Sequence, residues 1–210
     1  MAMDFSDALA ELPLVAILRG VKPEEAAEIG GALFTAGFRL IEVPLNSPDP
    51  LSSIEVLADR FGECALIGAG TVLSSVEART AIAAGARLIV MPNADPEVIG
   101  TAKAADAWCM PGIATPSEAV AALKADADAL KLFPAEILPP AFVKALKAVM
   151  PADVPLLPVG GIAPKSMADY VAAGAAGFGI GSSLYKPGAT AEEVASRAAA
   201  FVEAWRAIGR

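Results

Sequence analysis

Residues 83–93 read AAGARLIVMPN, in which an alanine-rich helical segment ends at Gly85 and a short apolar run follows at once. The same order recurs at residues 35–46, TAGFRLIEVPLN, and at residues 172–183, AAGAAGFGIGSS. A glycine just past a helix adopts the left-handed backbone conformation that ends it, and a short bounded apolar run is typical of a buried strand. The three segments therefore predict repeated helix–strand units.

Short apolar runs with helical segments between them continue along the whole chain. The eight candidate strands are Leu14–Leu18, Leu40–Leu45, Ala65–Ala69, Arg87–Met91, Ala107–Met110, Ala129–Phe133, Leu156–Val159 and Gly177–Ile180. Several of the helical segments open with Ser, Thr or Pro, as helices commonly do; they include Pro23–Ala36, Ser74–Ala84, Pro116–Leu123 and Pro164–Ala173. We expect one α/β domain over residues 1–210, a (β/α)8 TIM barrel with a short capping helix at Ser6–Glu11. An open doubly wound sheet has the same alternation of elements.

Composition and charge exclude several classes of partner. The formal charge of -8 argues against nucleic acid, which is bound by clustered Lys and Arg. The apolar stretches are shorter than the ~18 residues of a membrane helix, and the start, MAMDFSDALAEL, lacks the pattern of a signal peptide. The two cysteines have no metal-type spacing and fit a reducing compartment. We expect a cytoplasmic protein without nucleic-acid or membrane partners.

The chain contains no histidine, which limits the chemistry that it can perform. Ser-His-Asp and Cys-His nucleophiles, histidine zinc sites and imidazole acid–base catalysis are all excluded. The remaining options are lysine, carboxylates, backbone amides or a cofactor.

Three charged residues interrupt runs in which the pattern calls for apolar side chains. They are Arg19 in LPLVAILRG, Glu42 in RLIEVPLNS and Lys131 in DALKLFPA. An isolated buried charge costs several kcal/mol, and barrel enzymes place their chemistry at the carboxyl ends of strands, where we expect all three. A lysine among apolar neighbours has a lowered pKa and can act as an amine nucleophile, with Glu42 as proton carrier. The pair indicates carbonyl chemistry through an imine; the alternative is a structural ion pair.

Glycines follow the last two candidate strands. Gly160 and Gly161 come after the seventh strand, and Gly181 and Ser182 come after the eighth. Loops at these positions of barrel enzymes often bind phosphate through backbone N–H groups, although glycines also simply form turns. We expect a phosphate site there.

Seven motifs, in order along nearly the whole chain, resemble the keto-deoxy-phosphogluconate/hydroxy-ketoglutarate aldolases. They are AILRG (16–20), EVPLNSP (42–48), IGAGTVL (67–73), MPN (91–93), PGIATPSEA (111–119), ALKLFPA (129–135) and PVGGI (158–162). The resemblance implies a trimeric barrel and a class I aldolase, a lyase that needs no metal or cofactor. It implies that Lys131 is the Schiff-base residue and Glu42 the proton carrier. Arg19 and Thr71 would contact the carboxylate region of the substrate, with Pro92 lining it.

Two positions indicate the galactonate branch of that family. The gluconate type carries arginine where this chain has Asn46, and it tends to place threonine where this chain has Val159. The expected reaction is cleavage of 2-dehydro-3-deoxy-6-phospho-D-galactonate to pyruvate and D-glyceraldehyde 3-phosphate. The alternatives are a gluconate or dual-epimer aldolase, a sugar-phosphate isomerase in which Lys131 is only a point charge, and a non-catalytic phosphate-binding barrel.

Overall fold

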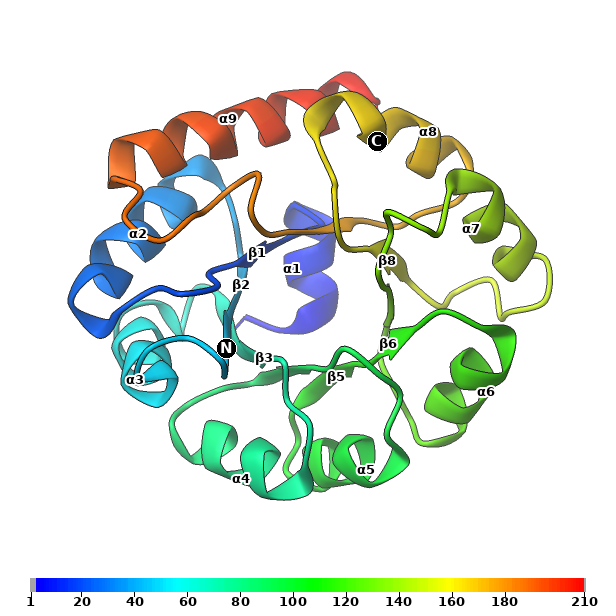
Figure 1. The fold of residues 1–210 in the computed structure, drawn as a ribbon, viewed down its shortest axis with the longest axis horizontal. Coiled ribbons are helices and arrows are strands. Elements are labelled where there is room, and N and C mark those ends of the chain that lie inside the picture. The colour runs from blue at the N-terminus through cyan, green and yellow to red at the C-terminus, as the bar shows by residue number, and fades with distance from the viewer. Residues whose placement is uncertain (1–2, 210) are drawn as a thin grey trace.

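The computed structural model describes residues 3–209 as an α/β fold, with curled parallel strands in the centre and helices outside (Figure 1). The strands are β1 (Leu14–Ile17), β2 (Leu40–Pro44), β3 (Leu66–Gly70), β4 (Leu88–Val90), β5 (Trp108–Met110), β6 (Gly112–Ile113), β7 (Leu130–Leu132), β8 (Leu156–Pro158) and β9 (Phe178–Ile180). The helices are α1 (Phe5–Glu11), α2 (Pro23–Ala36), α3 (Pro50–Phe61), α4 (Ser75–Ala83), α5 (Pro96–Ala104), α6 (Pro116–Lys124), α7 (Pro140–Lys147), the 3-10 helix η1 (Pro164–Ser166), α8 (Met167–Ala172) and α9 (Ala191–Ala207).

The strands form two parallel sheets, and this differs from the expected continuous eight-stranded barrel. Six strands pair in the order β5-β4-β3-β2-β1-β9 and three in the order β6-β7-β8. The expected fifth strand, Ala107–Met110, corresponds to β5, and Pro111, which has no N–H to donate, separates it from β6, a further short strand that the sequence pattern did not predict. Between β8 and β9 the pairing is reduced to a single parallel bridge, Val159 to Gly179. The ladder is therefore interrupted at two places.

Helix boundaries follow the predicted signals. The side chains of Ser74 and Thr115 accept hydrogen bonds from backbone N–H groups in the first turns of α4 and α6. Gly37, Gly85 and Gly174 follow α2, α4 and α8 and have φ values of 108°, 97° and 106°, the left-handed region that glycine enters without strain. These caps fix where α4 and α6 begin, and the glycines fix where α2, α4 and α8 give way to the next strand.

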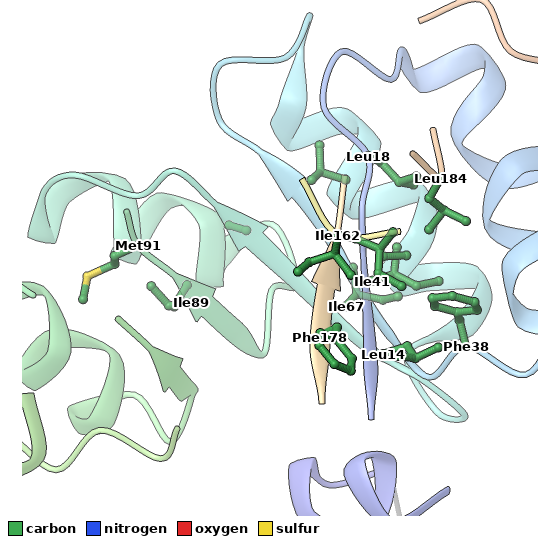
Figure 2. Close-up of a cluster of buried hydrophobic side chains, with 14 of the residues drawn as sticks. Leu14, Leu18, Phe38, Ile41, Ile67, Ile89, Met91, Ile162, Phe178 and Leu184 are labelled. Atoms are coloured by element: carbon green, nitrogen blue, oxygen red, sulfur yellow. The ribbon is translucent and has the colours of Figure 1, made fainter. Parts of the chain in front are cut away.

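The buried apolar residues divide into two clusters, because successive strand side chains point to opposite faces. The larger cluster lies between strands and outer helices, and Figure 2 shows Leu14, Ile41, Ile67 and Phe178 within it. The smaller cluster lies on the inner face of the strands. Its members include Val15, Leu40, Leu66, Leu88, Ala129 and Leu157.

The short N-terminal helix is present as α1 and belongs to the inner cluster. Its Phe5 and Ala8 are buried among the inner-face residues near the amino ends of the strands, and the Phe5 ring stacks on Trp108 at 5.6 Å. In Figure 1, α1 lies within the ring of outer helices. One end of the strand assembly is thus filled with apolar side chains, which leaves the carboxyl ends of the strands for polar groups.

Candidate active site

Glu42 and Lys131 project from the inner face of the strands. Glu42 lies two residues after Leu40 in β2, and Lys131 two residues after Ala129 in β7, so each follows an inner-face apolar residue by one period of the strand. Only 1% of Glu42 and 4% of Lys131 is exposed. The structure brings the two predicted residues into one buried, electrostatically coupled pair.

Burial dominates the electrostatics of this pair. Burial raises the pKa of Glu42 above its ordinary value, while the positive charges of Lys131 and Arg19 act in the opposite direction. Burial lowers the pKa of Lys131; Glu42 opposes this shift and Arg19 adds to it. Desolvation therefore favours the neutral amine and the neutral carboxylic acid.

The carboxyl group of Glu42 is closely confined by its neighbours. Its Oε2 atom has no hydrogen-bond partner among the described residues. A Cβ added to Gly70, at the end of the adjacent strand β3, would lie 2.7 Å from Glu42 Oε1 and 2.9 Å from its Cδ. The absence of a side chain at Gly70 makes room for the carboxyl group, and the free oxygen leaves it able to exchange a proton.

Arg19 is placed differently from the expectation of a buried strand residue. Strand β1 ends at Ile17, and Arg19 is exposed in the following loop, where long charged side chains keep their heads in water. Its Nη1 donates to Asn46 Oδ1 at 2.6 Å, and its Nη2 makes a long contact of 3.5 Å to Thr71 Oγ1. Asn46 therefore holds the guanidinium beside the inner-face pair.

Thr71 has a backbone conformation that is unusual for a β-branched residue. Its φ is 56°, in the left-handed region, which costs about 1–3 kcal/mol for a residue other than glycine. In this strained conformation the Thr71 hydroxyl lies next to Arg19. Such strained residues occur often at functional sites.

A cavity of about 250 Å³ opens beside these residues. The predicted site residues that line it are Arg19, Val159, Gly160, Gly161, Gly181 and Ser182. Gly160 and Gly161 have φ values of 111° and 64°, so a side chain at either position would be strained. The glycine loops after β8 and β9 thus share one cavity, as their positions in the sequence predicted.

Four predicted residues do not line this cavity: Lys131, Glu42, Thr71 and Pro92. Pro92 follows β4, and its carbonyl oxygen lies so close to Gly112 that a Cβ there would clash with it. Gly112 is the strand neighbour of Lys131. Pro92 therefore lies against β6, the strand that pairs with the lysine strand β7.

The cavity also includes residues that were not assigned to the site from the sequence. These are Ile17, Phe133, Glu136, Ile162, Ser183, Tyr185, Lys186 and Pro187. Phe133 could have been found, because it lies two residues after Lys131 and so on the same face of the chain; its ring centroid is 5.0 Å from the lysine Nζ. Glu136 has no comparable signal, because it lies in an irregular turn.

Residues 3–209 contain neither a metal-type cluster of side chains nor a membrane-spanning helix. No cluster of three or more Cys, Asp or Glu side chains is arranged to hold a metal ion in this part of the chain. None of the helices described has the length and apolar character needed to cross a membrane.

Comparison with known proteins identifies the family. The family model for KDPG and KHG aldolases matches residues 5–199. A probable 2-dehydro-3-deoxy-6-phosphogalactonate aldolase of Rhizobium meliloti is 48% identical over 198 residues, covering 94% of this chain and 93% of the relative. The 2-dehydro-3-deoxy-6-phosphogalactonate aldolase of Escherichia coli is 47% identical, covering 93% and 96%. The solved structure of native KDPGal superimposes with a TM-score of 0.94 at 45% identity, covering 99% and 98%. The chain belongs to the KDPG and KHG aldolase family of carbon–carbon lyases.

Proposed function

We propose that this protein cleaves 2-dehydro-3-deoxy-6-phospho-D-galactonate to pyruvate and D-glyceraldehyde 3-phosphate through a Schiff base on Lys131. The observation that carries the proposal is the buried pair, in which desolvation lowers the pKa of Lys131 and raises that of Glu42. A neutral amine is the form that attacks a carbonyl, and a neutral carboxylic acid is the form that donates a proton. Neither form is favoured for these groups in water.

In the proposed reaction, Lys131 Nζ attacks the C2 ketone to form a carbinolamine. Glu42, directly or through a water molecule, protonates the departing hydroxyl, and loss of water gives the iminium. The carboxylate of Glu42 then removes the C4 hydroxyl proton, the aldehyde forms, and the electrons of the C3–C4 bond move to the iminium as an enamine. Protonation at C3 gives the pyruvate iminium, and water releases pyruvate and restores the amine. One carboxyl group thus serves every proton transfer.

The remaining residues are proposed to hold the two anionic ends of the substrate. Arg19 and Thr71 bind the carboxylate region, with Asn46 fixing the guanidinium, and Pro92 lines that side. The phosphate is held by backbone N–H groups of the glycine loops, residues 160–161 and 181–182. The shared cavity and the positive φ values of Gly160 and Gly161 support this assignment, since a backbone without Cβ atoms lets an anion approach closely.

The choice of the galactonate epimer is supported by the names of the two relatives and by Val159. Val159 lines the cavity and has no hydroxyl with which to hydrogen-bond the C4 hydroxyl of the substrate. An apolar contact discriminates only modestly between epimers, so we expect detectable activity on the gluconate epimer as well.

The test is reductive trapping. Borohydride added with pyruvate should give a covalent mass increase on Lys131, and Lys131→Met should lose both trapping and cleavage. Lys124→Met, on the exposed side of α6, is the matched control and should keep both. An isomerase that uses Lys131 only as a charge gives no adduct, and neither does a non-catalytic barrel. Initial rates on the two epimeric substrates then decide the branch.

We further propose that the strands act as one closed (β/α)8 barrel domain that forms a cytoplasmic homotrimer without a cofactor. The bridge from Val159 to Gly179 and the hydrogen bond from Lys131 N–H to Pro111 O, 2.9 Å, support closure across both interruptions of the ladder. Exposed apolar side chains at Leu73, Val76 and Val120 support self-association. Light scattering of the purified protein tests the trimer.

A further inference from the structure

The turn after β7 carries a carboxylate into the cavity that the glycine loops line. Glu136 is exposed to solvent and is one of the cavity residues. The backbone around it is held in place, because Ala135 N–H donates to Val159 O at 2.8 Å. The buried hydroxyl of Tyr170 lies within hydrogen-bond distance of two carbonyl oxygens of the turn, Ala135 O at 3.0 Å and Leu138 O at 3.1 Å. These contacts anchor the turn on either side of Glu136.

The Glu136 side chain lies directly over the glycine pair. A Cβ built on Gly160 would clash with Glu136 Oε2, and one built on Gly161 would lie 2.9 Å from Glu136 Cγ. No other residue that the structure describes lies as close to the missing side chains of these two glycines. The surface over Gly160 and Gly161 is the proposed binding site of the substrate phosphate.

The charge of Glu136 is not neutralised by a direct ion pair. None of the ion pairs found between residues 3 and 209 includes Glu136, although the cavity also contains the cations Arg19 and Lys186. A phosphate on the glycine pair would meet a free carboxylate on the same surface. The two anions repel one another, and they cannot occupy the same place.

We infer that Glu136 competes with phosphate for the glycine pair and so weakens the binding of phosphate groups there. The inference rests on the proposed phosphate site. A substrate that is also bound by Lys131 and Arg19 gains free energy from those contacts, which offsets the cost of displacing the Glu136 carboxylate. Inorganic phosphate has no such contacts, so it is largely excluded from a pocket that must accept a phosphorylated substrate and release a phosphorylated aldehyde.

The test uses inorganic phosphate as the probe and Glu136→Gln as the variant, because Gln keeps the shape and removes the charge. We expect the inhibition constant of inorganic phosphate, measured in competition with the phosphorylated substrate, to fall about three- to tenfold at low ionic strength, and less at high salt. The Michaelis constant of the phosphorylated substrate should fall with it. Borohydride trapping of pyruvate, which carries no phosphate, should stay within about twofold of the parent.

Glu203→Gln is the matched control, since it removes the same charge from an exposed position on α9 outside this cavity. It should leave the inhibition constant unchanged. If the parent prefers the phosphorylated substrate but Glu136→Gln leaves the inhibition constant of inorganic phosphate unchanged or raises it, the inference is wrong and the proposed function still holds. A parent that cleaves phosphorylated and unphosphorylated substrates equally well overturns both.

Discussion

Gly70→Ala is predicted to impair catalysis by moving Glu42, although Gly70 itself carries no chemistry. The added Cβ would lie 2.7 Å from Glu42 Oε1, whereas ordinary van der Waals contact begins at 3.4 Å. Gly70 is not in the left-handed region, so alanine fits the backbone and the effect arises from this contact. Glu42 is 1% exposed and has no solvent space to enter, so its carboxyl group has to shift within the site.

The size of the effect follows from the geometry. A displacement of about 1 Å in a catalytic group can cost about 10²-fold in rate, so we expect kcat to fall roughly 10- to 100-fold. One extra methyl group in a closely packed site lowers the free energy of unfolding by about 1–3 kcal/mol. The two readouts should change together, because both arise from the same contact.

Pyruvate release in a coupled assay measures kcat, and urea unfolding measures stability. Gly100→Ala is the control, since a Cβ at Gly100 in α5 meets nothing within 4 Å. That variant should keep its kcat and gain about 0.5–1 kcal/mol of stability, because alanine is the better helix former. A Gly70→Ala enzyme with kcat within twofold of the parent would refute the idea that Gly70 positions Glu42.

Two further predictions concern the amine and the epimer choice. The rate of pyruvate trapping should rise with pH as Lys131 loses its proton and should level off below pH 10.5, the ordinary lysine pKa, because burial lowers the pKa of this amine; a rise that continues past that pH contradicts the burial argument. Val159→Thr should move the ratio of initial rates on the two epimers toward gluconate, by about tenfold at most, since one hydroxyl contact is added; an unchanged ratio would show that Val159 does not contact the C4 group.

The strand positions and the buried charged pair could be predicted because both depend on local patterns. Short apolar runs placed eight of the nine described strands within a few residues of their observed positions and missed β6, and the glycines after α2, α4 and α8 supplied boundaries. Glu42 and Lys131 were recognisable because a charge inside an apolar run has a large cost of burial unless it has a use. These signals lie within a few residues of sequence.

Other features depend on contacts between distant segments and were not predictable in this way. Arg19 has the same sequence signal as Glu42 but lies in the exposed loop after a strand that ends one residue earlier than expected. The room that Gly70 makes for Glu42 arises only when β2 and β3 pair in the observed register. Glu136 reaches Gly160 across a turn that has no periodicity. Each outcome depends on register or turn geometry, which a residue pattern does not fix.

The buried pair connects stability with chemistry. Beneath it the inner face is apolar and is closed by Phe5 of α1, so the cost of holding charges there is high. That cost is lowest when the proton is on Glu42 and absent from Lys131, which is the direction in which burial shifts both groups. The protonation state that costs least in this buried site is then also the state in which the proposed reaction begins. Lys131 is neutral and can attack the ketone, and Glu42 carries the proton that it donates. Exposing the pair to water would move both pKa values back toward their ordinary values and so disfavour the neutral amine that the first step requires.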